Sequence, residues 1–440
     1  MKTHNLKLLI ALLLSPLLVW AQPSGKIFKE KDPYELVFAG RIGQFTEGAA
    51  MAPDGRVYFS DILVRNYEAG HTGLIWRYDP ESGKTEVFRS PSGSSNGLAF
   101  DSKGRLLVCE AANQGGQRIT RTDMQTGIAK VVTWEFEGRR YNSPNDLVID
   151  KAGNIYFTDP RIVGVALMSQ PAHGVYKVDT SGEVTLVIAN IRKPNGIAMS
   201  PDQRTLYIST ADNTFNGDVS QNYKGDRSAF SGKLLAYAIK EDGSITFKRE
   251  LTDFGEGIGD GMTVDTEGNI YVSLFFNSKI AVYAPNGTLV DELQFPQWVT
   301  NVSFGRDKYK NTLFVTGREG LYEVETTKEG FHIDFEEQPP IQKVEVVAMK
   351  SKALDKYIGD YIIDENFSMK IFRDGNRLYS QGQGQSKIEI FPYETNKFFT
   401  KVMDAKLHFN MNSAGDITEI DFLQHGQSYK FTRQTKVQGK

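Results

Sequence analysis

Residues 143–160 read SPNDLVIDKAGNIYFTDP, and this stretch shows the unit from which most of the chain is built. The polar residue Asn145 precedes an apolar run, a turn at Asp150–Gly153 and a second apolar run, Ile155–Phe157. Asp and Gly readily adopt the backbone conformations that tight hairpin turns require. The stretch therefore predicts a β-hairpin whose first strand begins beside an oxygen-donor side chain.

The same unit occurs six times along the chain. The central residues of the six second strands follow one another at intervals of 49, 49, 51, 64 and 43 residues. A further turn signal later in each of the first five repeats predicts a second hairpin. Repeats of about 40–50 residues with four short strands each are typical of propeller blades. We therefore predict an all-β fold, a six-bladed β-propeller followed by a small antiparallel β-domain.

At 440 residues the chain is longer than a single core usually supports, so at least two domains are expected. We place the propeller at residues 22–328, with blade six closed by an N-terminal strand at about 34–38. A linker is expected at 329–350 and the small β-domain at 351–440. The pattern predicts that this domain begins with a short helical stretch, Ser351–Tyr361, before its alternating strands.

Residues 1–21 have the pattern of a secretory signal peptide, with two lysines, an apolar stretch and a small residue at the end. The apolar stretch is shorter than the roughly 20 residues that a membrane-spanning helix needs. We therefore expect an exported protein, periplasmic or secreted, with no membrane span. The net charge of −3 and the lack of a basic patch argue against a nucleic-acid partner.

The cysteine and histidine residues limit the kinds of active site that the chain could form. Cys109 is the only cysteine and lies in an apolar run, which predicts a buried, unreactive thiol. The six histidines are scattered, so a zinc site with His or Cys ligands is not expected. The insertion at Thr210–Gly232 is polar and long, and it is interpreted either as a lid or as a surface excursion.

An oxygen-donor side chain precedes each second strand by ten to twelve residues. If the repeats close into a ring, these side chains occupy equivalent positions and point at one spot on the axis. Carboxylate and amide oxygens are the ligands of a hard cation such as Ca²⁺, or another divalent ion that prefers oxygen. Asn-Gly and Asn-Asp are also common turn dipeptides, so a purely structural role is the alternative. The six donors are Glu47, Asn96, Asn145, Asn195, Asp260 and Asn301.

Five segments between about residues 35 and 325 resemble the senescence-marker-protein (regucalcin)/gluconolactonase family. They are Glu47-Gly48, Ser143-Pro144-Asn145-Asp146, Phe157-Thr158-Asp159-Pro160, Lys193-Pro194-Asn195-Gly196 and Gly259-Asp260-Gly261-Met262. The resemblance implies a six-bladed propeller that hydrolyses a small-molecule lactone at one divalent ion. It implies that the metal ligands are Glu47, Asn145, Asn195 and Asp260. It also implies that Asn96 and Asn301 lie beside the ion or touch the substrate. The C-terminal segment resembles the small β-domain appended to some β-lactamase-like serine hydrolases.

Two departures from the family pattern leave the substrate open. Ser143 stands where some relatives carry an arginine that grips a sugar acid, which makes Ser143 a candidate substrate contact. The pair Cys109-Glu110 is not followed by the histidine often present in bacterial members.

Three functions are compatible with the sequence. The first is a calcium-dependent lactonase or carboxylic ester hydrolase, with Asp260 as general base and Asp146 as the second candidate. The second is a non-catalytic Ca²⁺-binding propeller that serves as a sensor or carrier. The third is an organophosphate-type hydrolase at the same ion, with Asp260 as nucleophile.

Overall fold

A computed structural model describes most of the two domains. The described residues are 27–28, 34–39, 45–62, 73–112, 115–124, 126–162, 168–213, 230–318, 320–336, 346–364, 367–383, 387–401, 405–424 and 427–434. The predicted signal peptide, most of the 210–232 insertion, and His4, His71 and His425 lie outside these residues. Within them, no helix is long and apolar enough to cross a membrane.

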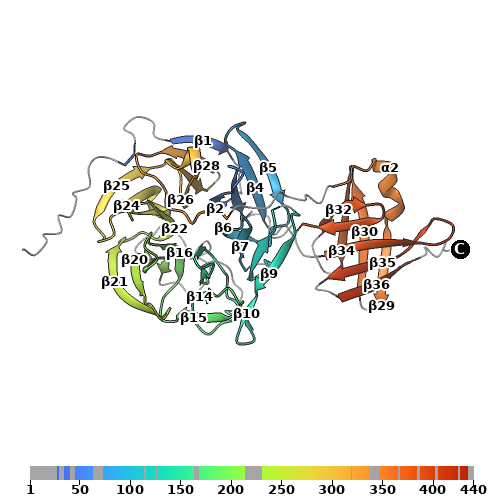
Figure 1. The fold of residues 1–440 in the computed structure, drawn as a ribbon, viewed down its shortest axis with the longest axis horizontal. Helices are drawn as coiled ribbons and strands as arrows, with labels where there is room; N and C mark the ends of the chain where they lie inside the picture. Colours follow the sequence, from blue (N-terminus) through green and yellow to red (C-terminus); the bar gives the residue numbers. More distant parts are fainter. Residues whose placement is uncertain are drawn as a thin grey trace, which may run out of the picture.

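Six four-stranded antiparallel sheets surround a central axis (Figure 1), which confirms the predicted propeller. Blade 1 consists of β2 (Thr46–Met51), β3 (Val57–Asp61), β4 (Leu74–Asp79) and β5 (Lys84–Arg89). Blade 2 consists of β6 (Ser95–Phe100), β7 (Leu106–Glu110), β8 (Arg118–Thr122) and β9 (Ala129–Thr133). Blade 3 consists of β12 (Leu147–Ile149), β13 (Ile155–Asp159), β14 (Gly174–Val178) and β15 (Val184–Ile188). Blade 4 consists of β16 (Pro194–Met199), β17 (Thr205–Thr210), β20 (Lys233–Ile239) and β21 (Ile245–Asp253). Blade 5 consists of β22 (Gly259–Val264), β23 (Ile270–Leu274), β24 (Lys279–Tyr283) and β25 (Leu289–Gln294). Blade 6 consists of β26 (Val299–Phe304), β27 (Thr312–Gly317), β28 (Gly320–Glu325) and β1 (Tyr34–Ala39). Shorter elements are β10 (Glu135–Phe136), β11 (Arg139–Arg140), β18 (Asp212–Asn213), β19 (Phe230–Ser231), η2 (Phe275–Asn277) and η3 (Asp307–Tyr309).

The last blade is built from both ends of the domain. β1 pairs antiparallel with β28, with Tyr34 opposite Val324. This pairing leaves β28 without a free edge, and closing a ring in this way prevents edge-to-edge aggregation.

The core lies between neighbouring blades. In blades 1 to 5 the second strand is buried along its whole length. In blades 1 and 5 a tyrosine of this strand meets an aromatic residue of the next blade edge-on: Tyr58 contacts Phe100 at 5.5 Å, and Tyr271 contacts Phe304 at 5.0 Å. Such pairs contribute roughly 0.5–1.5 kcal/mol beyond the area they bury. Tyr58 and Tyr271 therefore help to hold blade 1 to blade 2 and blade 5 to blade 6.

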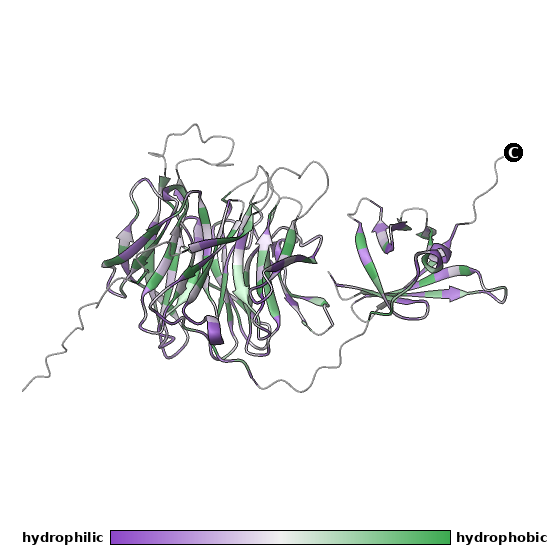
Figure 2. Ribbon diagram, turned by 90° about the horizontal axis from the view of Figure 1, so that it is seen from above, coloured by the Kyte–Doolittle hydropathy of each residue, from purple (hydrophilic) through white to green (hydrophobic). Residues whose placement is uncertain are grey.

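The C-terminal domain is a closed eight-stranded antiparallel barrel. Figure 2 shows the barrel and the propeller as separate bodies, with apolar residues along the strands of both. The barrel strands are β29 (Gly359–Asp364), β30 (Phe367–Asp374), β31 (Arg377–Gly382), β32 (Ile388–Glu394), β33 (Lys397–Thr400), β34 (Ala405–Met411), β35 (Ile417–Gln424) and β36 (Gln427–Arg433).

The predicted helical stretch Ser351–Tyr361 is wrong over its last part. The helix α2 (Ser351–Leu354) and the short turn η4 (Asp355–Tyr357) are followed at once by β29. Tyr361 pairs with both β30 and β36, and its side chain is fully buried. Pairing on both sides closes the barrel, so tertiary contacts outweigh the local helical pattern here.

The chain that leaves blade 6 closes one end of the propeller axis. The N–H of Phe331 donates to the carbonyl of Val264 in blade 5 at 3.0 Å. The N–H of Glu336 donates to the carbonyl of Ser102, next to blade 2, at 2.6 Å. Blades 5 and 2 face each other across the ring, so residues 326–336 cross the channel. We call them the strap; their last eight residues were expected to be linker.

We expect His332 in the strap to make the stability of the propeller depend on pH. Its Nε2 lies 2.8 Å from the carbonyl oxygen of Gly305, and burial and the charge of Arg306 lower its pKa from 6.5 to about 3. The unfolded chain therefore takes up this proton first, and the stability present above about pH 6.5 is lost as pH falls towards 3. We expect a loss of about 2 kcal/mol by pH 5.

The variant His332→Gln keeps a side-chain N–H for Gly305 but has no proton to gain. Urea unfolding at pH 7 and pH 5 should show a smaller acid-induced loss of stability in this variant than in the wild type. The same loss in both proteins would contradict the assignment.

Candidate metal centre

In five of the six blades the innermost strand has an irregularity in its pairing at the predicted donor position. In blade 1 the register shifts between Glu47 and Ala49, and similar shifts occur in blades 2, 4, 5 and 6. Bulges of this kind re-aim side chains and are common next to active sites. The pairing beyond the bulge places six residues at one level of the ring: Glu47, Asn96, Asn145, Asn195, Asp260 and Thr300.

The prediction that Asn301 occupies the sixth equivalent position is wrong. Val302 pairs with Val315 as Ala49 pairs with Phe59, which leaves Thr300 at the level of Glu47. The sequence count failed because the turn between β26 and β27 contains η3 and is longer than the other turns. Asn301 lies one level further along the axis.

At this second level, two opposite blades carry polar side chains and the other four carry glycine. Asp146 belongs to blade 3 and Asn301 to blade 6. A Cβ on Gly97 would lie 2.7 Å from the Cα of Asp146, and a Cβ on Gly261 would overlap the amide of Asn301. Because glycine has no side chain, Asp146 and Asn301 have room to reach the axis at this second level.

Hydroxyl groups fix the first level to the blades. A hydroxyl side chain near the end of a second strand donates to the carbonyl of the first-level residue in the next blade, at 2.7–2.8 Å. The pairs are Ser60 to Asn96, Thr158 to Asn195, Ser209 to Asp260 and Ser273 to Thr300. In blade 2 this position is Cys109, which is fully buried, and burial raises its pKa. The thiol is therefore a packing residue, as the sequence predicts.

Three carboxyl groups share this buried space. Burial and the charges of Asp260 and Asp146 raise the pKa of Glu47, and burial and Asp146 raise that of Asp260. Burial raises the pKa of Asp146 to about 7. The Asn301 amide donates to Glu47 and Asp146, and the Asn195 amide donates to Asp260. These amide contacts orient the carboxylates but leave their mutual repulsion uncompensated.

The donor set fits a hard divalent cation. Glu47, Asn195 and Asp260 are 3–7% exposed, and Asn145 is somewhat more exposed. The Oδ1 atom of Asn195 is buried without a hydrogen-bond partner, although buried amide oxygens nearly always have one. Among the described residues no three Cys, His, Asp or Glu side chains form a metal-binding group by themselves. A cation here would thus depend on asparagine oxygens, which suit Ca²⁺.

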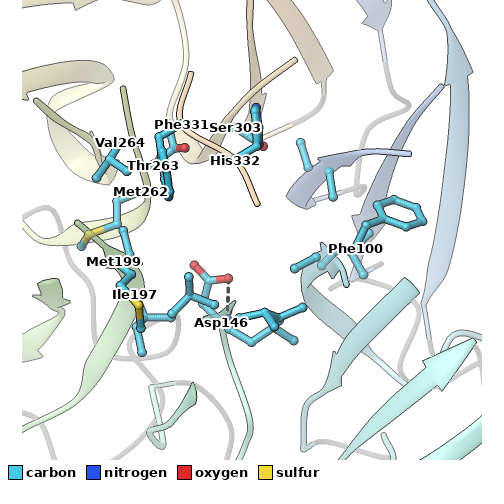
Figure 3. A pocket seen from close by; sticks show the side chains of 18 of the residues that line it. Phe100, Asp146, Ile197, Met199, Met262, Thr263, Val264, Ser303, Phe331 and His332 are labelled. Atoms are coloured by element: carbon cyan, nitrogen blue, oxygen red, sulfur yellow. Dashed lines mark hydrogen bonds between the residues drawn. The ribbon is translucent and has the colours of Figure 1, made fainter. Parts of the chain in front are cut away.

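A cavity of about 150 Å³ lies between the second level and the strap. Figure 3 shows the Asp146 carboxylate directed into it, with Phe331 and His332 on the other side. The remaining wall combines apolar side chains such as Phe100, Ile197 and Met262 with polar ones, among them Ser303 and Arg306. Asp146 therefore faces the closed end of the channel, whereas Asp260 belongs to the level above.

The rim beyond the first level has residues that the sequence did not single out. Ser143, the candidate substrate contact, already has a hydrogen-bond partner within the protein, because its Oγ accepts the N–H of Ala112 at 3.0 Å. Lys193 holds the equivalent place in blade 4, two residues before Asn195, and is buried. Sequence reasoning could have found Lys193, because it stands two residues before its donor asparagine, as Ser143 does.

Comparisons with known proteins agree with this architecture. The chain matches the family described as SMP-30/Gluconolactonase/LRE-like region over residues 45–318, and a domain of unknown function, DUF3471, over residues 343–437. A gluconolactonase of Zymomonas mobilis is 27% identical over 312 residues, which are 64% of this chain and 79% of that protein. A pentonolactonase of Haloferax volcanii is 26% identical over 61% of this chain and 80% of that protein. The solved structure of a gluconolactonase from Xanthomonas campestris has a TM-score of 0.55 at 26% identity, covering 67% of this chain and 89% of that one. The chain belongs to the SMP-30/gluconolactonase/LRE-like family.

Proposed function

We propose that the protein is a calcium-dependent lactonase that opens a sugar lactone or a related carboxylic ester. The main support is that the buried carboxyl groups of Glu47, Asp146 and Asp260 lie close enough to raise one another's pKa, and that the Oδ1 of Asn195, at the same level of the ring as Glu47 and Asp260, has no hydrogen-bond partner. The relatives of the chain include named lactonases. The ligands in this proposal are Glu47, Asn145, Asn195 and Asp260.

A divalent ion held by Glu47, Asn145, Asn195 and Asp260 would polarise the lactone carbonyl and would stabilise the negative charge that develops on its oxygen. Asp260 takes a proton from the water that attacks the carbonyl carbon. The bond between that carbon and the ring oxygen then breaks, and the ring oxygen receives a proton. Asp146 is the alternative base. Its place on the cavity side of the second level favours a supporting role, in which it fixes Glu47 through the shared Asn301 amide.

We also propose that residues 1–21 direct export to the periplasm or the medium, and that the two domains divide between the end of the strap at residue 336 and residue 351. The signal-peptide pattern and the change of repeat pattern support these assignments. The N-terminal residue of the mature protein tests the first, and limited proteolysis tests the second.

A panel of neutral and acidic lactones, assayed by acid release with and without a calcium chelator, tests the activity. We expect turnover that chelation abolishes and added Ca²⁺ restores. A melting temperature that rises with Ca²⁺, without acid release from any lactone, would favour a binding protein instead. Incorporation of heavy oxygen from labelled water into Asp260 during phosphotriester turnover would favour the organophosphate-type reaction.

A further inference from the structure

Blade 6 differs from the other blades at the first level of the ring. Among the six innermost strands, all of which lie within the described residues, only that of blade 6 brings no acidic or amide side chain to this level; it carries Thr300. Thr300 is fully buried. Its Oγ1 donates to the carbonyl of Thr46 in blade 1 at 2.8 Å and lies 2.8 Å from Thr316 Oγ1 in β27. These contacts direct the hydroxyl towards blade 1 and towards its own second strand, away from the axis.

Asn301, the next residue along β26, does not replace the missing donor. Its Oδ1 accepts the N–H of Val302 at 2.8 Å, so this oxygen is used within its own strand. Its amide group donates to Glu47 and Asp146. The Oδ1 of Asn195 in blade 4, by contrast, is buried without a hydrogen-bond partner. Neither Thr300 nor Asn301 therefore turns a free oxygen towards an ion on the axis.

The two carboxylates of the first level flank the place that Thr300 leaves. β26 lies beside β2 and β22, the strands that carry Glu47 and Asp260. The three asparagines of this level belong to blades 2, 3 and 4, on the other side of the ring. Ca²⁺ takes roughly six to eight oxygen ligands, so the four proposed protein ligands leave about two to four places for water or substrate. One of these places lies over Thr300, between the two carboxylates.

The described part of the rim above Thr300 is aromatic. Trp298 stands two residues before Thr300. Phe275 of blade 5 contacts Trp298 at 4.9 Å and Phe45 of blade 1 at 5.9 Å between ring centres. Blade 6 stands between blades 5 and 1, so these rings lie together at its rim. Such a surface can pack against the carbon atoms of a lactone ring while the carbonyl group points down towards the first level.

We propose that Thr300 leaves one coordination position of the ion open, and that the carbonyl oxygen of the lactone takes this position between Glu47 and Asp260. This inference rests on the proposed function and adds the side of the ring on which the substrate binds. It also accounts for the choice of base, because Asp260 borders the open position, whereas Asp146 lies at the second level. Thr300 is thus a positioning residue, which acts by withholding a donor that the other blades supply.

The luminescence of terbium tests the open position without turnover. Tb³⁺ occupies oxygen sites that suit Ca²⁺, and its decay rates in H₂O and in D₂O count the water molecules on the ion. Thr300→Asn adds at this level the side chain that blades 2 to 4 carry, so its ion should hold about one water fewer than that of the wild type. Thr300→Asp should have the same effect, and both variants should bind Ca²⁺ at least as tightly as the wild type. Thr300→Val, the matched control, loses the hydroxyl without adding an oxygen and should keep the wild-type number of waters.

Binding of a product extends the test to the substrate. Gluconate, the acid formed from D-glucono-δ-lactone, has a carboxylate that can take the open position, and it should remove about one water from the wild-type ion. Calorimetry in the presence of Ca²⁺ should show at least about tenfold weaker gluconate binding by Thr300→Asn than by Thr300→Val. Lactone turnover by Thr300→Asn should fall by about a hundredfold although its Ca²⁺ affinity is kept. Asp260→Asn, by contrast, should lose both turnover and affinity.

The outcomes separate this inference from the lactonase proposal. If no lactone is opened, but Thr300→Asn loses a bound water and binds gluconate more weakly, the lactonase proposal fails and the open position stands. An unchanged number of waters in both donor variants, or full turnover by Thr300→Asn, overturns the assignment to blade 6. A wild-type ion that holds no water for gluconate to displace overturns it as well.

Discussion

We expect Asp260→Asn to abolish lactone turnover, with a fall in kcat/KM of about a thousandfold or more. The substitution keeps the shape of the side chain and one oxygen donor, but it removes one of two carboxylates at the first level of the ring. It also removes the group that takes the proton from water in the proposed reaction. Metal affinity should fall with activity, because Glu47 is then the single carboxylate at that level.

The measurement is lactone hydrolysis at saturating Ca²⁺, combined with calorimetric Ca²⁺ titration. Asp242→Asn, in an exposed turn of blade 4, is the matched control and should change neither quantity. Asp146→Asn separates the two candidate bases, since a supporting residue should retain more activity than the base itself. Near wild-type turnover by Asp260→Asn would remove Asp260 from the mechanism.

The propeller was predictable because its signals are local and repeated. Turn residues and apolar runs recur in a fixed order, so even unequal intervals identify the blades. Five of the six first-level residues were also found, since the turn between the first two strands has nearly constant length in those blades. Asn301 was misplaced because η3 lengthens that turn in blade 6. Strand register depends on the ladder and not on a residue count, and a short shift changes which side chain reaches the axis.

The features that were missed depend on contacts between distant segments. The strap resembles a linker because its hydrogen bonds are made to Val264 and Ser102, far away in sequence. β29 was taken for the end of a helix because its pairing with β36 closes a barrel about seventy residues later. No local pattern carries that information.

Gly48→Ala is expected to cost about 3 kcal/mol of stability and to weaken Ca²⁺ binding. Gly48 follows Glu47 at the bulge with φ +26°, and an added Cβ would lie 2.7 Å from the Cα of Gly97 and 2.8 Å from the N of Leu98. Those atoms are backbone of the innermost strand of blade 2, which cannot rotate away as a side chain could. Relief requires that blades 1 and 2 move apart where the ring narrows most, and Glu47 moves with them.

Gly55→Ala separates this steric effect from the general cost of replacing a glycine. Gly55 has φ +79° and open space around the position of its Cβ, so the substitution pays only the backbone cost of about 1 kcal/mol. Urea unfolding of both variants, with and without Ca²⁺, gives the comparison. Equal losses in the two variants would mean that blade spacing does not constrain the site. A larger loss in Gly48→Ala, together with reduced stabilisation by Ca²⁺, would show that close contact between blades 1 and 2 holds Glu47 in place. The glycine after Glu47 would then be as necessary to the metal centre as the carboxylate itself.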